Sequence, residues 1–183
     1  MKNKISKQHQ KIEINHLSHD ILGGVWPGIQ LYYPPVKYSP SLGVYEDLIE
    51  ASKRIKKHAH TTEAHTLIFD LEDGCRQKEM SRTLLESELP ELRKKRSDIS
   101  IAIRINPFRT EEYINDLAFI KKLPECIDVV ILAKAGEVYG AAEIRDLSSN
   151  LIDLNENISI QPIIEHPKSL KIATDLMSFS TVK

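Results

Sequence analysis

The sequence predicts an α/β fold in which about five βα units build a sheet of parallel strands. From Gly28 onward, short β-rich runs alternate with longer segments of helical spacing, which is the pattern of repeated βα units. The 183 residues are 41% hydrophobic and 28% charged, and this balance suits one buried core better than disorder or a coiled coil. The expected strands also divide into an apolar row and a row that ends in polar groups.

Five β-rich runs are the expected strands. They are Ile29 to Tyr33, Thr66 to Leu71, Ile99 to Ile105, Ile127 to Ala133 and Ile158 to Ile164. Successive side chains of a strand face opposite sides, so Ile101 and Ile103 share one face of the third strand while Arg104 lies on the other. If the apolar rows pack against helices, the charged ends of the other rows collect at the C-terminal edge of the sheet. Parallel α/β proteins place their active sites at that edge.

A helix is expected after each strand, and the first two are defined by apolar stripes. The first helix follows Pro40, and its stripe consists of Val44, Leu48, Ala51 and Ile55. The stripe of the second helix consists of Met80, Leu84, Leu85, Leu89 and Leu92. Both stripes have the spacing of residues on one helix face.

The remaining three helices are defined mainly by their start signals. The third opens at Thr110, with acidic residues in its first turn that suit the helix dipole. Its buried side is expected to contain Ile114, Leu117 and Ala118. The fourth helix lies within residues 137–151. The fifth starts at Pro167, a residue suited to the first helical position.

Composition limits the location and the partners of the chain. The 25 Lys and Arg residues nearly balance the 26 Asp and Glu residues, which argues against binding to nucleic acid or to an anionic membrane. No apolar run approaches the roughly 18 residues of a membrane span, and residues 1–27 form a polar extension unlike a signal peptide. We therefore expect a cytoplasmic protein with one domain over residues 28–183, in which Cys75 and Cys126 are reduced thiols.

Three carboxylates cluster at the end of the second expected strand. Asp70, Glu72 and Asp73 lie within four positions, where mutual repulsion and desolvation require a nearby positive charge. The candidates within the chain are Arg104 and Lys134 on neighbouring strands. The candidate outside it is a divalent metal with oxygen ligands.

The residues alone leave two interpretations of this edge open. In the first, Glu165 at the end of the fifth strand supplies one ligand of a Mg²⁺ site, and Arg104 binds a substrate carboxylate through its planar fork. In the second, Asp73 caps the next helix, Arg104 pairs internally with Glu72, and Glu165 is a solvated loop acid. The first interpretation predicts a binding site and the second an ordinary set of structural contacts.

Several motifs, in order, resemble the HpcH/HpaI aldolase and citrate lyase β-subunit family. The stretch Leu67 to Gly74, followed by Lys78 and Arg82, is similar to the Asp-Leu-Glu-Asp signature of that family. Further matches are Gln30-Leu31-Tyr32-Tyr33-Pro34, Arg104-Ile105-Asn106-Pro107, Val130-Ile131-Leu132-Ala133-Lys134 and Ile163-Ile164-Glu165. The resemblance covers about residues 29 to 182.

The resemblance implies a Mg²⁺-dependent carbon-carbon lyase or aldolase with a (β/α)8 TIM barrel. Its substrates would be oxo acids, hydroxy acids or their CoA thioesters. Arg104 would bind the substrate carboxylate and Glu165 the metal, while Asp70, Glu72 and Asp73 would support them. Lys134 is left open between a charge in the site and an internal ion pair. Tyr32 is left open between a wall of the substrate pocket and a packed barrel residue. No catalytic residue is assigned.

The chain departs from the family pattern in length and at two positions. A complete barrel takes about 250 residues, so the sequence holds about five βα units, a partial (β/α)8 barrel. The family's second metal ligand, an Asp after the next strand, is not reached before Lys183. Ala133 stands where the family has Pro, and Gly136 stands where it has Glu.

These departures keep two other interpretations in view. One is a catalytically inactive partial barrel that acts as a binding or assembly subunit, and the other is a fragment of a longer enzyme. An incomplete barrel leaves strand edges and apolar surface exposed. We therefore expect a homo-oligomer or a partner chain that covers the exposed strands.

Overall fold

The computed structural model describes residues 28–177 and contains one five-stranded parallel sheet of order β1-β4-β5-β6-β7. Its strands are β1 (Gln30–Tyr33), β4 (Thr66–Asp70), β5 (Ser100–Ile105), β6 (Val129–Leu132) and β7 (Ser159–Pro162). All five predicted strands are present with slightly narrower bounds. The polar extension expected over residues 1–27 lies outside the described residues.

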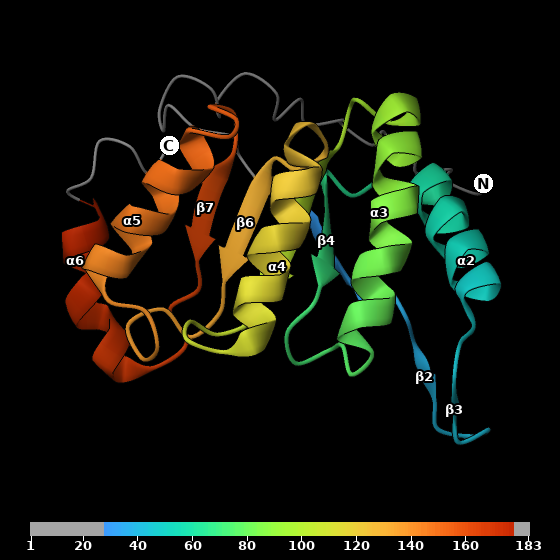
Figure 1. Ribbon diagram of the computed structural model, residues 1–183, viewed down its shortest axis with the longest axis horizontal. Coiled ribbons are helices and arrows are strands. Elements are labelled where there is room, and N and C mark those ends of the chain that lie inside the picture. Colours follow the sequence, from blue (N-terminus) through green and yellow to red (C-terminus); the bar gives the residue numbers. More distant parts are fainter. Residues whose placement is uncertain (1–27, 178–183) are drawn as a thin grey trace, which may run out of the picture.

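Helices cover one face of this sheet (Figure 1). They are α2 (Leu48–Thr61), α3 (Lys78–Lys95), α4 (Glu111–Lys122), α5 (Ala141–Ile152) and α6 (Leu170–Met177), with short 3₁₀ turns η2 (Pro124–Cys126) and η3 (Pro167–Ser169). The five strands of this sheet lie side by side in the order in which they occur along the chain, as expected for successive βα units. The predicted α/β fold with parallel strands is confirmed as an open sheet, and over the described residues it does not close into a barrel.

The side chains of the strands divide between the two faces of the sheet as the strand alternation predicts. Phe69, Ile103 and Val130 belong to the main core beneath the helices. On the other face, Ile68 and Ala102 belong to a smaller apolar cluster. Asp70 and Arg104 follow these two residues in the same rows, so their side chains lie at the C-terminal end of the face without helices.

The sheet curls toward the face without helices. Gln30 of β1 donates from Nε2 to Oε1 of Gln161 in β7 at 3.2 Å, although these strands are the two ends of the strand order. Contact between the end strands across this face requires strong curvature, as in part of a (β/α)8 barrel. The face without helices is therefore concave.

The first helix starts later than predicted. The residues directly after Pro40 belong instead to a hairpin of β2 (Tyr38–Ser39) and β3 (Val44–Tyr45), with Gly43 at a φ of 69° in the turn. Helix α2 begins at Leu48, because Asp47 caps it by accepting a hydrogen bond from the Glu50 amide at 2.9 Å. Val44 therefore lies in a strand, and the prediction of a helix directly after Pro40 was wrong. The buried residues of α2 are Ala51, Ile55 and Ala59.

Helix α4 begins where predicted but buries a different face. The Thr110 hydroxyl accepts the Tyr113 amide at 3.1 Å and caps the helix. Ile114 is 65% exposed and Ala118 is also exposed, so the prediction was wrong for these two residues, whereas Leu117 is partly buried and packs against the core. Asp116 takes the innermost position instead, because its carboxylate binds partners on neighbouring elements. The fully buried side of α4 also includes Phe119.

The other sequence predictions for the core agree with the structure. Helix α3 falls where its apolar stripe places it, α5 lies within one residue of the range expected for the fourth helix, and Pro167 opens the turn η3 that leads into α6. Cys75 and Cys126 are free and buried. Between residues 28 and 177, every helix is too short or too polar to cross a membrane.

Candidate functional site

The site begins with an ion pair between two neighbouring strands. Asp70 and Arg104 are paired across the β4–β5 ladder, and both side chains lie on the concave face. Arg104 donates from Nε to Oδ1 at 2.7 Å and from Nη2 to Oδ2 at 2.6 Å. This bidentate arrangement is the strong form of an arginine-carboxylate pair. It fixes the direction of the guanidinium at the C-terminal edge of the sheet.

Asp70 also shapes the turn that follows β4. Its Oδ1 accepts the Glu72 amide at 2.9 Å, and its Oδ2 accepts the Gly74 amide at 3.1 Å. A Cβ atom on Gly74 would lie 2.4 Å from Oδ2, so the close approach of the chain requires glycine here. Asp70 therefore orients Arg104 and positions Glu72.

Glu72 lies between the two cations of the site. Its side chain is only 3% exposed. Oε1 accepts a hydrogen bond from Lys134 Nζ at 2.6 Å, whereas Oε2 is 3.4 Å from Arg104 Nη1 and has no hydrogen-bond partner. The alternative prediction that Arg104 pairs internally with Glu72 is therefore only partly met, because the hydrogen-bonded partner of Arg104 is Asp70.

Lys134 reaches the site through an unusual backbone conformation. Strict alternation after β6 would place it on the helix-covered side with Leu132, but its φ of 58° turns the chain. Its ammonium contacts Glu72 and lies 3.5 Å from Asp73 Oδ2. Lys134 is thus both a charge in the site and part of an internal ion pair. Asp73 is exposed and does not cap α3, whose N-cap residue is Gln77.

Tyr32 and Glu165 complete the cluster from the two ends of the sheet. The Arg104 guanidinium lies 5.5 Å from the centroid of the Tyr32 ring. Tyr32 is 43% exposed, so it lines the site and is not a packed core residue. Glu165 is exposed, and its Oε1 accepts the Lys134 amide at 3.1 Å. All seven predicted side chains therefore meet at one edge of the sheet: Tyr32, Asp70, Glu72, Asp73, Arg104, Lys134 and Glu165.

Electrostatics keep the two site cations charged. Burial lowers the pKa of Arg104, but the hydrogen bonds and charge of Asp70, together with the charge of Glu72, raise it overall. The pKa of Lys134 is raised, chiefly by its hydrogen bond to Glu72. Burial raises the pKa of Tyr32, with a smaller opposing effect of Arg104. At neutral pH, the site therefore presents a guanidinium, an ammonium and an un-ionised phenol.

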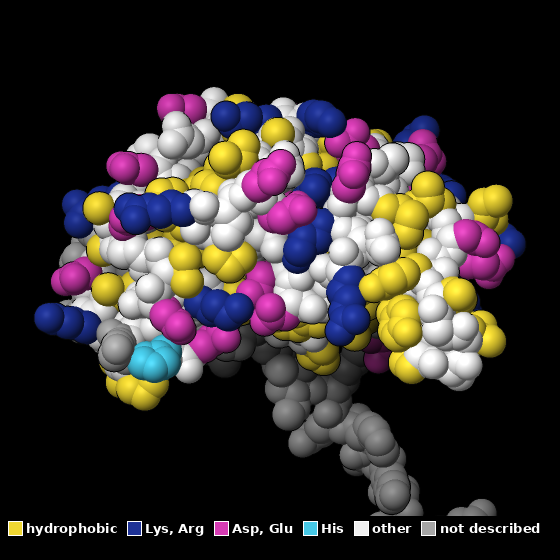
Figure 2. Space-filling view, turned by 60° about the horizontal axis from the view of Figure 1, so that its bottom comes forward, with side chains coloured by type: hydrophobic (Ala, Val, Ile, Leu, Met, Phe, Trp, Pro, Cys, Tyr) yellow, Lys and Arg dark blue, Asp and Glu magenta, His cyan; other side chains and the backbone are white. Residues whose placement is uncertain are grey.

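The site carries a small excess of negative charge. The site holds the four carboxylates of Asp70, Glu72, Asp73 and Glu165 and the two cations Arg104 and Lys134. A third cation, Lys78, donates to the Leu71 and Glu72 carbonyls of the adjacent turn, so the formal charge of these groups is -1. Figure 2, in which the lower side of Figure 1 comes forward, shows acidic and basic side chains side by side over much of this surface. An anionic substrate therefore needs further positive charge for tight binding.

A buried polar network supports the site from behind, and sequence reasoning missed it. Asp116 accepts hydrogen bonds from Arg82 Nη1 at 2.8 Å and from the amide and Nδ2 of Asn106 at 2.8 and 2.7 Å. Asn106 Nδ2 and Lys78 Nζ both donate to the Leu71 carbonyl. These contacts hold the turn that carries Glu72. The sequence signals were that Asn106 follows Arg104 in one motif and that Lys78 and Arg82 follow Gly74 in another, but neither motif pointed to Asp116.

The described residues supply few metal ligands. Between residues 28 and 177, no three His, Cys, Asp or Glu side chains gather in a way that could hold a metal ion. Asp70 and Glu72 are already bound by Arg104 and Lys134, and Asp73 lies 3.5 Å from Lys134, so within residues 28–177 Glu165 is the one carboxylate of the site that binds no side-chain cation. A Mg²⁺ ion takes one or two protein carboxylates plus water and substrate oxygens. Glu165 therefore fits as a single ligand.

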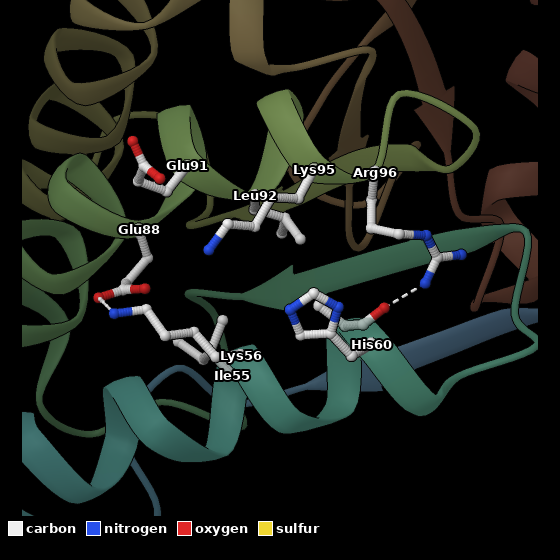
Figure 3. Close-up of a pocket in the computed structure, with 9 residues that line it drawn as sticks. Ile55, Lys56, His60, Glu88, Glu91, Leu92, Lys95 and Arg96 are labelled. Atoms are coloured by element: carbon white, nitrogen blue, oxygen red, sulfur yellow. Dashed lines mark hydrogen bonds and ion pairs between the residues drawn. The ribbon is translucent and has the colours of Figure 1, made fainter.

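A small cavity lies elsewhere, between α2 and α3 (Figure 3). Its volume is about 20 Å³, room for about one water molecule. Its walls include His60 and Arg96 near the C-terminal ends of the two helices. In a βα unit this end lies opposite the C-terminal edge of the strands, so the cavity is separate from the site.

Comparison with known proteins supports the fold. No protein-family model matches the sequence, and no curated protein matches it. The crystal structure of RipC from Yersinia pestis is similar, with a TM-score of 0.55 and 20% sequence identity over 85% of this chain and 54% of the RipC chain. This likeness shows that the two chains share an α/β architecture. The present chain spans about half the length of RipC.

Proposed function

We propose that the site binds a small carboxylic acid through Arg104 and that the chain carries part of a Mg²⁺-dependent carbon-carbon lyase or aldolase of the HpcH/HpaI and citrate lyase β-subunit family. The substrates would be oxo acids, hydroxy acids or their CoA thioesters. The fold and the gathering of the motif residues at one edge support this proposal. The compartment proposed is the cytoplasm, and a second copy or a partner chain would cover the open strand edges.

The observation that carries the proposal is that Asp70 binds only one edge of the Arg104 guanidinium. Asp70 uses Nε and Nη2, while Nη1 makes only the 3.4 Å contact with Glu72. Arginine has five donors in a planar fork, so the outer edge retains donors for a carboxylate. Because Asp70 already holds the guanidinium in place, binding of a ligand does not bear the entropic cost of ordering the arginine side chain.

Charge balance supports Mg²⁺ as the cofactor. A formal charge of -1 disfavours a substrate carboxylate, and a divalent cation beside Glu165 would reverse that sign. When bound, Mg²⁺ would supply a Lewis acid that stabilises negative charge on a substrate oxygen as a carbon-carbon bond breaks. Arg104 would orient the substrate carboxylate, and Lys134 would add positive charge beside it. Tyr32 would line one side of the bound acid.

Glu165→Gln is the variant that tests the metal proposal. The amide has no charge to hold Mg²⁺, so Mg²⁺ affinity measured by isothermal titration calorimetry is expected to fall at least about tenfold. Glu156→Gln is the matched control, since Glu156 is exposed before β7 at the opposite edge. That control is expected to bind Mg²⁺ as the wild type does. A wild-type chain that shows no heat of binding with millimolar Mg²⁺ and pyruvate contradicts the proposal.

A second candidate is an assembly or binding subunit without catalytic activity. The hairpin and the start of α2 expose large apolar side chains, since Leu42 is 74%, Val44 53% and Ile49 66% exposed. Figure 2 shows hydrophobic side chains gathered at the end of the molecule where Figure 1 places β2 and β3. Exposed apolar groups of this kind favour contact with another chain. Self-association in sedimentation, together with no binding of Mg²⁺ or acids, would favour this candidate.

A further inference from the structure

Glu72 holds a buried hydrogen-bond acceptor without a donor in the middle of the site. The side chain is 3% exposed, and Oε2 has no hydrogen-bond partner. Buried polar atoms are nearly always paired, because an unpaired one retains its full desolvation penalty. Its neighbour Oε1 is satisfied by Lys134 at 2.6 Å, so the deficiency is confined to the oxygen that faces Arg104.

The unpaired acceptor, Glu72 Oε2, lies beside a donor, Arg104 Nη1, that also makes no hydrogen bond. Arg104 Nη1 is 3.4 Å from Glu72 Oε2, and the distance and geometry do not give a hydrogen bond. The bidentate contact with Asp70 holds the guanidinium and prevents it from turning to satisfy Glu72. Between residues 28 and 177, Nη1 therefore lacks an acceptor and Oε2 lacks a donor, although the two atoms are neighbours.

We propose that Glu72 determines substrate specificity and that the site prefers 2-hydroxy acids to 2-oxo acids. This inference rests on the proposed binding of a carboxylate by Arg104. A 2-hydroxy acid carries an acceptor, its carboxylate, and a donor, its hydroxyl, on adjacent carbons. The carboxylate binds Nη1 and the hydroxyl donates to Oε2, so one ligand satisfies both atoms.

A 2-oxo acid does not complete this pattern. Its carbonyl oxygen only accepts hydrogen bonds, and Glu72 as a carboxylate between two cations also has only acceptor atoms. The oxo group would face Oε2 without a proton between them, and the buried oxygen would stay unpaired. Sites that bond a substrate hydroxyl reject analogues without it for this reason.

Three acids that differ only at the second carbon test the preference. The full chain is titrated with lactate, pyruvate and propionate at a fixed millimolar Mg²⁺ concentration, and binding is followed by NMR. The better lactate enantiomer is expected to bind at least about fivefold tighter than pyruvate, the lower end for pairing one buried acceptor. Equal affinity for lactate and pyruvate overturns this inference but leaves carboxylate binding in place. Absence of binding by all three acids overturns both proposals.

Glu72→Gln tests whether the preference for lactate depends on Glu72 or on chelation of the acid by Mg²⁺. Its amide oxygen still accepts from Lys134, while its amide nitrogen places a donor where Oε2 was. The ratio of lactate affinity to pyruvate affinity is expected to fall at least about fivefold. Glu156→Gln is the charge-matched control, because Glu156 is exposed and lies at the opposite edge of the sheet. That control is expected to keep the wild-type order, and an equal fall in both variants overturns the assignment. The wild-type comparison of the three acids remains decisive if Glu72→Gln does not fold.

Discussion

Replacing Arg104 with alanine is expected to lower the free energy of unfolding by about 3–5 kcal/mol, the range for breaking a buried ion pair. The change leaves Asp70 and Glu72 without the cation between them, and these side chains are 8% and 3% exposed. Asp70 also holds the turn after β4, so the loss extends to the Glu72 and Gly74 amides. Denaturant unfolding of wild type and variant measures the difference.

The same substitution removes the proposed carboxylate site. Binding of lactate and pyruvate to Arg104→Ala is expected to become undetectable under conditions in which the wild type responds. Lys53→Ala is the control for the loss of an ion pair in general, because Lys53 and Glu50 are 67% and 59% exposed. Such exposed pairs contribute at most about 1 kcal/mol. A loss below about 1 kcal/mol for Arg104→Ala as well would show that the Asp70 pair is not a structural element.

Asp116→Ala is expected to have a comparable effect on stability, about 3–5 kcal/mol. Asp116 is fully buried and binds Arg82 and Asn106 from two other elements. Without it, Arg82 loses one of its two carboxylate partners, and the Asn106 side chain and amide lose their shared acceptor. Because Asn106 also donates to the Leu71 carbonyl, the turn that carries Glu72 is expected to loosen.

Asp116→Asn distinguishes the hydrogen bonds from the charge. Burial raises the pKa of Asp116 despite the opposing hydrogen bonds from Asn106 and the charge of Arg82, so the folded state disfavours the ionised form. The amide avoids that desolvation and keeps one acceptor for Asn106. Its unfolding free energy, from the same denaturant experiment, is therefore expected to lie between those of the wild type and Asp116→Ala. Equal stability of Asp116→Ala and the wild type would contradict the structural role of the network.

The sequence was sufficient to predict the edge of the sheet at which the charged residues meet. Strand alternation placed Asp70 and Arg104 on the face opposite Ile103, and the structure confirms this. The partner of Arg104 was not predictable, because the choice between Asp70 and Glu72 depends on strand register. Asp70 lies directly opposite Arg104 in the ladder, whereas Glu72 lies beyond the end of β4.

Local backbone geometry accounts for what sequence patterns missed. Lys134 has a positive φ, a conformation that no alternation rule anticipates for a lysine. The start of α2 was misplaced because Val44 fits the spacing of the apolar helical stripe but pairs with Ser39 in a hairpin. The inward face of α4 was misjudged because an apolar-stripe argument does not anticipate a buried acid such as Asp116, whose partners come from distant segments.

The most direct test of the account is a crystal structure of the chain with Mg²⁺ and lactate. The lactate carboxylate is expected to bind Arg104 Nη1, and its hydroxyl is expected to lie within hydrogen-bond distance of Glu72 Oε2. Asp70 is expected to remain bound to Nε and Nη2 of Arg104. Lactate bound at another surface, or an Arg104 that has left Asp70 to reach its ligand, would contradict the claim that a fixed guanidinium at the strand ends is the binding site.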